Sequence, residues 1–345
     1  MQAGMLQKKT VLLWLMLLSL EGFAQIGGED TYRFLSLTNS ARFAALGGSH
    51  AALTDSADLN LPFHNPALLQ ESMTRQVLVN YVRYMADIHY GYASTAFAAG
   101  RYGIAALGVH YINYGSFTEA DEEGNLTGNQ FRAGEYALNL IWSGQYRNWR
   151  YGVNLKPVFS AFESYRSFGM AGDAGLAWFS PSGNSILGVV ARNFGSQITT
   201  YYDNGEKEPL PFDLMVGFSR KLRHAPVVFS VSANHLSDWT LATPSDEESG
   251  GEFVVKPQES FGKQIMRHLL AGIEVMPSRH FTLRAGYNYH LRQELKLDQR
   301  LSTVGLSLGF GVKVKRFRLD YATTRYHLAG TSNHLSLGIN LNRFF

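Results

Sequence analysis

Histidine and carboxylate side chains are the groups in this chain that could bind a metal ion or transfer a proton. The sequence contains eleven histidines, and none of them stands in the His-Glu-x-x-His spacing that sets two imidazoles and a general base on one helix face. Cysteine is absent from the sequence, which excludes thiolate nucleophiles, thiolate metal ligands and disulfides. Serine, histidine and aspartate occur throughout, so a membrane lipase or protease with a Ser-His-Asp triad is kept as a third hypothesis.

Two acidic runs, Asp121–Glu123 and Ser245–Glu252, could attract a hard cation such as calcium. Neither run has the ligand spacing of a calcium-binding loop, and the ordinary explanation for each is a solvated tip of a surface loop. The sequence therefore predicts no metal ion, no cofactor and no catalytic residue.

The first residues predict export from the cytoplasm. A pair of lysines precedes the apolar run 11–20, and the small residues Gly22 and Ala24 stand just before the expected cleavage point. This is the pattern of a signal peptide, and the run is shorter than the roughly 20 apolar residues of a spanning helix. We expect residues 1–24 to be removed. Because no cysteine follows, we expect no lipid anchor.

Composition narrows the class of protein further. The net charge is only +3, and basic and acidic residues are interspersed, so no nucleic-acid partner is expected. Aromatic residues make up 13% of the chain, and glycine contributes 34 residues. An exported chain rich in aromatics and glycine is typical of an outer-membrane β-barrel.

Alternation of apolar and polar residues is the main structural signal, because a barrel wall turns one face to lipid and the other to the lumen. In the segment 279–292 one face carries Phe281, Leu283, Ala285, Tyr287, Tyr289 and Leu291. The same pattern along the chain predicts fourteen strands, near 75–86, 88–99, 101–114, 131–143, 145–159, 168–180, 184–194, 210–221, 225–238, 266–277, 279–292, 300–313, 315–327 and 333–345. Boundaries from such a pattern are good to a few residues.

The connections separate a membrane barrel from a soluble all-β protein, which could show the same alternation. Short connections near residues 99, 143, 180, 221, 276 and 312 alternate with longer ones at 115–130, 160–167, 195–209, 239–265, 293–299 and 328–332. Outer-membrane barrels have short periplasmic turns and longer extracellular loops. The sequence therefore predicts an all-β fold, a transmembrane antiparallel β-barrel of about fourteen strands that crosses the outer membrane many times.

Charged residues on the inward faces suggest two uses for the lumen. The inward residues are Lys156, Arg284, Arg292, Arg316, Arg318 and Asp320. They could line an anion-selective channel or a ligand-binding interior. Because charges of both signs occur on neighbouring strands, we favour a network of ion pairs that fills the barrel.

Aromatic residues in the expected extracellular loops also have two interpretations. Tyr201, Tyr202 and Asp203 lie in one loop, and Trp239 begins the longest one. Such aromatics are common in the girdle at the headgroup level of a barrel. They could instead form a platform that binds a partner protein, since exposed aromatics often anchor interfaces.

Residues 25–73 precede the first expected strand and lack its alternation. They are rich in small residues, Gly47 and Gly48 allow close backbone approach, and Asn65 reads as a helix N-cap with Pro66 at the first helical position. Such a segment could fill the lumen as a plug or form a small periplasmic extension. The pattern alone leaves both open.

At this point the sequence resembles a known superfamily. The string SARFAALGG followed by FHNPALL is similar to the N-terminal hatch fingerprint of the FadL-like outer-membrane barrels. The matching residues are Arg42, Gly47, Gly48, Asn65, Pro66 and Ala67. The resemblance implies a fourteen-stranded barrel with a hatch, which divides the chain into signal peptide 1–24, hatch or plug 25–73 and barrel 74–345.

Within that superfamily the opening QIGGEDTYRFLSLTNSARFAALGG and the later blocks VVARNFGSQI and PLPFDLMVGFSRKL resemble the PorQ-like barrels of the type IX secretion system of Bacteroidetes. The resemblance implies a scaffold without enzymatic activity in the attachment complex. It would hold a PorZ-like surface protein and act with a PorU-like sortase and a PorV-like barrel. Secreted cargo would then be processed and attached to anionic lipopolysaccharide. The terminal Phe345 resembles the insertion signal of outer-membrane barrels.

The alternative function is a FadL-like transporter of hydrophobic small molecules. Such a transporter should have an apolar pocket at the hatch and a kinked strand. The charged inward faces argue against an apolar conduit, whereas Pro157 inside the fifth expected strand is a candidate kink.

Overall fold

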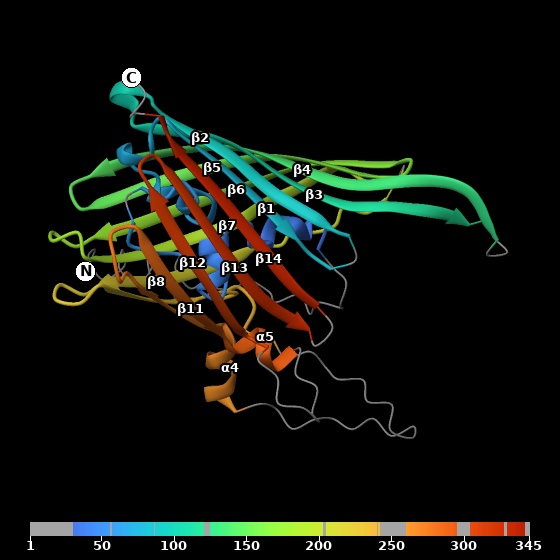
Figure 1. Ribbon diagram of the computed structural model, residues 1–345. Coiled ribbons are helices and arrows are strands. Elements are labelled where there is room, and N and C mark those ends of the chain that lie inside the picture. Colours follow the sequence, from blue (N-terminus) through green and yellow to red (C-terminus); the bar gives the residue numbers. More distant parts are fainter. Residues whose placement is uncertain are drawn as a thin grey trace, which may run out of the picture. The chain divides into compact units, whose positions relative to one another are not determined.

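The computed structural model is a closed antiparallel β-barrel (Figure 1). It describes residues 30–341 apart from 56, 86, 121–124, 203–204, 240, 242–259, 295–303 and 328–329. The described strands are β1 (Gln76–Arg83), β2 (His89–Ala98), β3 (Ile104–Ala120), β4 (Leu126–Tyr146), β5 (Trp149–Phe162), β6 (Tyr165–Phe179), β7 (Ser185–Thr199), β8 (Asp213–Lys221), β9 (Val227–Ala233), β10 (Leu269–Val275), β11 (Phe281–Asn288), β12 (Leu306–Val314), β13 (Phe317–His327) and β14 (Gly330–Asn340). Each strand pairs with its neighbours in sequence, and β1 pairs with β14 to close the barrel. The predicted fourteen-stranded fold is confirmed.

Short helices make up the rest of the regular structure. The described 3₁₀ helices are η1 (Arg33–Ser36), η2 (Pro66–Leu68), η3 (Glu71–Met73) and η4 (Gly100–Tyr102), and the described α-helices are α2 (Ala41–Ala45), α3 (Leu61–His64), α4 (Phe261–His268) and α5 (Tyr289–Glu294). Among the residues that the structure describes, none of the helices has the length and apolar character needed to span a bilayer.

The wall alternates as a membrane barrel requires. In β5 the side chains of Tyr151, Val153 and Leu155 are exposed on the outside, whereas Asn154 and Lys156 are buried in the lumen. Exposed apolar side chains of this kind occur on nearly every strand. Because a continuous apolar belt is unfavourable in water and is covered by lipid in a bilayer, the strands form a transmembrane wall.

The wall differs from the predicted boundaries in several places. Residues 195–199, expected as loop, continue β7, whereas residues 234–238 and 266–268, expected as strand, follow β9 and end α4. Residues 115–130 and 160–167, expected as loops, are largely strand, because β3 and β4 continue their ladder beyond the wall and β5 and β6 are joined by a tight turn. The sequence alternation fades there because no lipid faces those residues. Tyr289 and Leu291, expected on the outer face of a strand, instead lie in α5.

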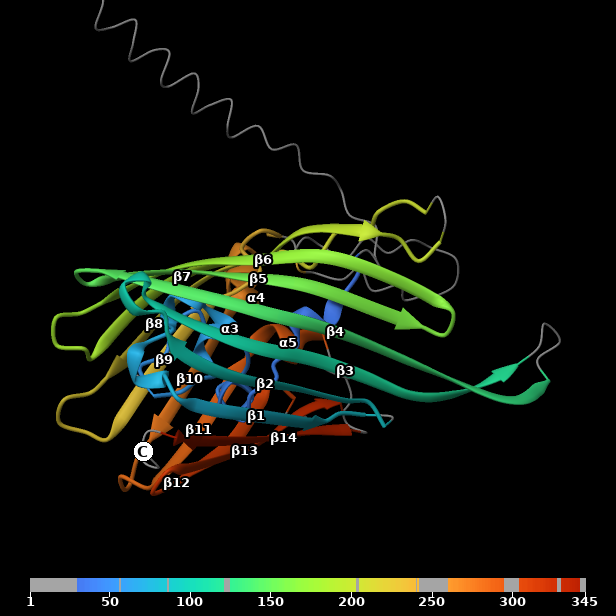
Figure 2. The same cartoon turned by 90° about the horizontal axis from the view of Figure 1, so that it is seen from above.

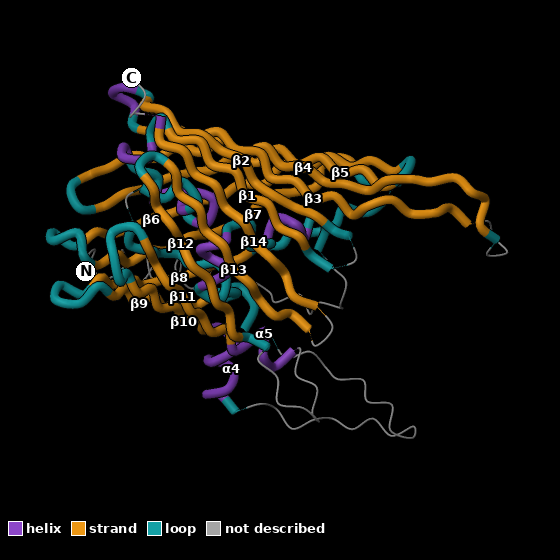
Figure 3. The backbone as a smooth tube through the Cα atoms, in the orientation of Figure 1, coloured by secondary structure: helices purple, strands orange, loops and turns teal. Residues whose placement is uncertain are grey.

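The described part of residues 31–73 lies inside the barrel, and we call it the plug (Figure 3). The plug side chains Phe43, Leu46 and Phe63 are fully buried, and they pack with wall residues such as Ile141 and Ile186. Burial of these side chains between plug and wall is the main apolar contribution to holding the plug in the lumen.

Glycines on the inner wall let the plug backbone touch the strands. A Cβ at Gly286 of β11 would overlap the backbone of Leu46 and Gly47, and one at Gly152 of β5 would overlap the backbone of Pro66 and Ala67. A side chain at either position would push the plug from the wall, so the close approach requires glycine.

Candidate functional site

Arg42 joins the plug to the barrel wall. Its guanidinium donates from Nε and Nη2 to the two carboxylate oxygens of Glu274 on β10, at 3.0 and 2.5 Å. From Nη1 it also donates to Asp58 at 3.0 Å and to Asp55 at 3.3 Å, both within the plug. Arg42 is only 2% exposed. One buried cation therefore holds two plug carboxylates and one wall carboxylate.

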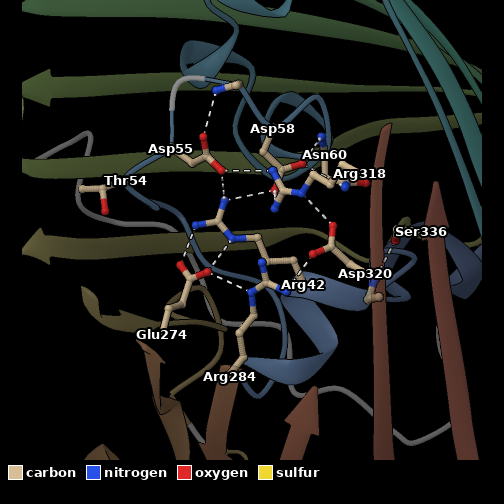
Figure 4. A network of polar contacts seen from close by, with 12 residues as sticks. Arg42, Thr54, Asp55, Asp58, Asn60, Glu274, Arg284, Arg318, Asp320 and Ser336 are labelled. Atoms are coloured by element: carbon tan, nitrogen blue, oxygen red, sulfur yellow. Dashed lines mark hydrogen bonds and ion pairs between the residues drawn. The ribbon is translucent and has the colours of Figure 1, made fainter. Parts of the chain in front are cut away.

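Two wall arginines complete a ring of ion pairs around this contact (Figure 4). Arg284 on β11 donates to Glu274 at 2.9 Å and to Asp320 on β13 at 2.7 Å. Arg318 donates to Asp320 at 2.7 Å, to Asp55 at 3.0 Å and to Asp58 at 3.3 Å. The contacts run from Arg42 through the wall and back into the plug. We call these seven residues the ion-pair ring.

The ring has three arginines and four carboxylates, so its formal charge is −1. Burial alone would lower the pKa of Arg42, but Glu274, Asp55 and Asp58 outweigh it and raise that pKa well above its usual range. Burial alone would raise the pKa of Asp58, but Arg318 and Arg42 hold it well below its usual range. Both groups therefore stay charged, because each is paired.

A second buried ion pair lies elsewhere in the lumen. The ammonium of Lys156 on β5 donates to Asp173 on β6 at 2.7 Å and to the side chain of Asn193 on β7 at 2.8 Å. Asp173 also accepts from Asn154 at 3.0 Å. Lys156 and Asp173 are 1% exposed or less in their side chains. This pair links three adjacent strands of the wall.

The predicted inward charges are brought together only in part. Arg284, Arg318 and Asp320 belong to the ion-pair ring, and Lys156 belongs to the second pair. Of the remaining two, Arg292 lies in α5, and Arg316 lies in the turn between β12 and β13. Apart from Asp320, sequence reasoning missed the acidic partners. Glu274 and Asp173 occupy inward positions of strands that are otherwise mostly apolar, and this position could have identified them. No sequence pattern marks Asp55 and Asp58 as partners of an arginine.

The residues of the hatch fingerprint all lie within the plug. Arg42 is in α2, and Gly47 and Gly48 follow that helix with φ of 96° and 136°, values that favour glycine. The side chain of Asn65 accepts from the backbone N–H of Ala67 at 3.0 Å and donates to the carbonyl of Ala51 at 2.8 Å. Asn65 is thus the N-cap of η2, in which Pro66 and Ala67 are buried.

The loop aromatics lie near other aromatic rings. Tyr202 is 63% exposed and its ring centroid lies 4.9 Å from that of Tyr165. Tyr201 is half-buried and donates from its hydroxyl to Ser160 at 2.7 Å. Trp239 is 45% exposed and lies against His268. Of the three candidate partner residues that the structure describes, Tyr202 and Trp239 are therefore more available to another molecule than Tyr201.

Several sequence predictions fall outside the described residues. These are the signal peptide 1–24, Asp203, the acidic runs Asp121–Glu123 and Ser245–Glu252, and the terminal Phe345. Among the residues that are described, no group of three or more His, Asp or Glu side chains has an arrangement that could hold a metal ion.

Strands β3 and β4 extend beyond their neighbours as a two-stranded ribbon (Figure 2). Strand β2 pairs with β3 only as far as Asn113, and β5 pairs with β4 only from Ala133. The carbonyl of Arg132 still accepts from the backbone N–H of Glu163 at 3.3 Å, so the described part of residues 114–131 has outer edges without a strand partner. We call this part the ribbon. Near its base, Phe117 and Phe131 pair across the strands with ring centroids 5.3 Å apart. Phe117 is 43% exposed.

A cavity of about 520 Å³ opens at the end of the barrel that carries the short turns. Its inner part is lined by Arg42, Arg284 and Arg318 of the ion-pair ring, and its mouth by Lys221 and by residues of the β10–β11 turn. A smaller cavity of about 150 Å³ lies near the other face of the plug, beside Arg192 and Asp213. Both are lined largely by polar and charged side chains.

Comparison with known proteins gives a likeness of fold. No family model and no curated protein matches the sequence. The structure is similar to a deletion mutant of the monoaromatic hydrocarbon channel TodX, with a TM-score of 0.52 and 13% identity over 87% of this chain and 98% of that chain. It is also similar to the toluene transporter TbuX of Ralstonia pickettii, with a TM-score of 0.50 and 12% identity over 90% of this chain and 98% of that chain.

Fold and lumen together define a class, the plugged transmembrane β-barrels. Within that class the chain has the fourteen-stranded fold expected from its resemblance to FadL-like barrels, and it shares this fold with TodX and TbuX.

Proposed function

We propose that this chain is an outer-membrane scaffold that anchors a surface protein, and that it has no enzymatic activity. The ion-pair ring carries this proposal. A conduit for apolar molecules needs an apolar path past the plug, since such ligands bind in mostly apolar pockets. Here the plug is tied to β10, β11 and β13 by buried charges, with Arg42 at the centre. Opening this lumen would separate buried ion pairs, which is costly.

The end of the barrel opposite the short turns offers a surface for a partner. The ribbon extends outward with two unpaired edges, and an unpaired edge is a template for an added strand from another chain. Its exposed Phe117 and the exposed loop residues Tyr202 and Trp239 provide aromatic anchors. A two-stranded ribbon is only marginally stable alone, so a bound partner would also stabilise it.

The resemblance to PorQ-like barrels supplies the identity of the proposed partners. We infer a PorZ-like surface protein held by the extracellular loops, with a PorU-like sortase and a PorV-like barrel in the same attachment complex. In that setting secreted cargo is processed and joined to anionic lipopolysaccharide of the bilayer surface. The chain itself would contribute anchoring and position.

The experiment is affinity purification of the tagged chain from outer membranes, with identification of the proteins that co-purify. The matched variant replaces residues 116–132 by Asn-Gly and leaves the wall intact. We expect wild type to recover a surface protein and the shortened variant to lose it, while both insert as folded barrels. Recovery of no surface protein, together with normal cargo anchoring in a deletion strain, would overturn the proposal.

A transporter of hydrophobic small molecules is the second candidate, and one observation favours it. The ladder between β4 and β5 pairs Ala137 with Val158 and next pairs Leu140 with Leu155, so the pairs around Pro157 are missing. Proline lacks the N–H that a ladder needs, and such an interruption weakens the wall locally. The solved structures with this fold include a hydrocarbon channel and a toluene transporter.

The two functions respond differently to Pro157→Ala. Restoring the N–H should strengthen the ladder and leave surface-partner recovery unchanged if the chain is a scaffold. A transporter that uses this part of the wall would lose uptake of a radiolabelled aromatic hydrocarbon. Uptake by cells that express wild type, and its loss in the variant, would favour the transporter.

A further inference from the structure

Arg192 on β7 is a buried cation without a carboxylate partner in the described part of the chain. The buried Lys and Arg residues that the structure describes are Arg42, Lys156, Arg192 and Arg284. The other three each donate to a carboxylate at 2.5 to 2.7 Å. No ion pair between described residues involves Arg192. A charge buried without a counter-charge is costly, so stability alone does not explain an arginine at this position.

The contacts of Arg192 are with neutral groups and are long. Nη1 donates to the hydroxyl of Ser49 at 3.4 Å, and Nη2 donates to the carbonyl of Leu35 at 3.3 Å. Both exceed the usual N–H···O distance of about 2.9–3.0 Å. The guanidinium carbon lies 5.6 Å from the ring centroid of Phe63, and Nε has no hydrogen-bond partner among the described residues. Arg192 therefore keeps a free donor and a positive charge that its neighbours compensate only weakly.

Arg192 lines the cavity of about 150 Å³ that lies between the plug and the inner wall. The cavity is at the end of the barrel with the longer connections, since its lining includes Asp213 at the start of β8 and Leu270 near the start of β10. Two residues of its lining reach the surface: Ser36 of the plug is exposed, and the side chain of His235 is 45% exposed. A small solute can therefore reach the cavity from that end.

Two acceptor groups line the same cavity beside Arg192. Asp213 stands directly opposite Arg192 in the β7–β8 ladder and accepts from the backbone N–H of His235 at 2.7 Å. Asn234 donates from Nδ2 to the carbonyl of Ser49 at 2.8 Å, and its Oδ1 has no partner among the described residues although Asn234 is only 8% exposed. Because Arg192 and Asn234 both bond Ser49, the three side chains converge on one place.

Charge and volume together select a class of ligand. Arg192 offers a cationic donor, whereas Asp213 and Asn234 offer an anionic and a neutral acceptor. A simple carboxylate would be repelled by Asp213, and a simple amine by Arg192, because like charges in contact are unfavourable. An engineered cavity of about 150 Å³ in another protein holds benzene, so about six non-hydrogen atoms fit such a volume. A small molecule that carries both charges on adjacent atoms meets both conditions.

We propose that this cavity binds a small zwitterionic α-amino acid of the size of alanine. The carboxylate of the ligand accepts from Arg192, and its ammonium group donates to Asp213 and to Oδ1 of Asn234, by charge-assisted hydrogen bonds. The site is independent of the proposed scaffold function, because none of the ribbon residues lines this cavity.

The test is equilibrium dialysis of radiolabelled alanine against the folded full-length barrel in a non-ionic detergent. Propionate and ethylamine serve as competitors, since each lacks one of the two charged groups of alanine. The variants are Arg192→Gln and Asp213→Asn, and an asparagine at 213 keeps an acceptor for the N–H of His235. The control, Lys221→Gln, removes one cation from the lining of the larger cavity at the other end. Heat modifiability on a gel verifies that all four proteins are folded.

We expect wild type and Lys221→Gln to bind alanine at least about tenfold more tightly than either competitor, and Arg192→Gln to lose at least about tenfold in alanine affinity. Asp213→Asn should weaken alanine binding and strengthen propionate binding, because the repulsion of the carboxylate is removed. This reversal decides the case if Arg192→Gln fails to fold.

The absence of saturable alanine binding by wild type at about 10 mM would overturn the proposal. An equal loss of alanine affinity in Arg192→Gln and Lys221→Gln would also overturn it. Propionate binding by wild type as tight as alanine binding, or no gain of propionate affinity in Asp213→Asn, would overturn the zwitterion as the ligand class.

Discussion

The guanidinium of Arg42 and the carboxylate of Glu274 form a two-point ion pair across 232 residues of sequence. Arg42 belongs to the plug and Glu274 to strand β10, so the pair fixes one part of the chain inside another. Two parallel hydrogen bonds also fix the orientation of the guanidinium plane, which places its third nitrogen toward Asp58 and Asp55. The position of the plug in the lumen follows from this geometry.

Removal of Arg42 and Glu274 together should destabilise the protein by less than the sum of the two single removals, because the two side chains are paired. Arg42→Met leaves the four carboxylates of the ring with only two arginines, and breaking such a buried pair costs about 3–5 kcal/mol. The double variant Arg42→Met/Glu274→Met should lose less than the sum of the single variants. Urea unfolding followed by tryptophan fluorescence measures all of them. Additive losses, or a loss equal to that of the exposed control Glu206→Gln, would contradict the ring.

Stability should fall as the pH is lowered from neutral, and His50 contributes to that fall. Its Nε2 donates to the carbonyl of Leu46 at 3.0 Å, so the neutral ring accepts at Nδ1 from Ser232. Burial lowers the pKa of His50 to about 4. In the unfolded chain the pKa of His50 is near 6.5, so the unfolded state takes up the proton before the folded state does as the pH falls. The stabilisation that neutral His50 contributes is therefore complete above about pH 6.5 and is lost by about pH 4. The full loss is about 3 kcal/mol.

His50→Gln should therefore reduce the slope of unfolding free energy against pH between about 6.5 and 4. Some slope should remain, because burial also lowers the pKa of His64 in the plug. The exposed His224 gives the control variant His224→Gln, which should leave the slope unchanged. A His50→Gln slope equal to that of wild type would show that His50 does not titrate differently on folding.

Most of the wall could be predicted from sequence, and most of the ring could not. Strand alternation is a local property, so the amino-acid pattern alone assigns Arg318 and Asp320 to the inner face, where both side chains lie. The contact between Arg42 and Glu274 depends on how the plug sits in the closed barrel, and the residues next to either one do not indicate it. The ribbon was missed for a different reason. Its strands continue to pair beyond the wall, where no membrane requires apolar and polar residues to alternate, so the sequence pattern indicated a loop.

Gly286→Ala should displace the plug while the barrel still inserts. A Cβ there would overlap the backbone of Leu46 and Gly47. Because the N–H of Leu46 donates to the carbonyl of Arg42, a shift of this backbone would also move the plug helix that carries Arg42. We expect faster proteolysis of residues 31–73 in the folded barrel and a loss of stability of about 1–3 kcal/mol. Gly262 in α4 has open space around its Cβ position, so Gly262→Ala is the control. Identical digestion rates in the two variants would contradict the close approach.

The ribbon should be required for partner binding and dispensable for folding. Phe117 and Phe131 pair beyond the part of β3 and β4 that β2 and β5 flank, so Phe117→Ser/Phe131→Ser removes two aromatic anchors without opening the core. Glu119 still accepts from Thr127 and Asn129, which holds the two strands together. We expect unchanged urea unfolding and at least a tenfold loss of the co-purified surface protein, about 1.4 kcal/mol of binding free energy. Phe212→Ser removes an equally exposed aromatic from another connection and should retain the partner. Retention by the ribbon variant and loss by the Phe212 variant would move the docking surface to the β7–β8 connection.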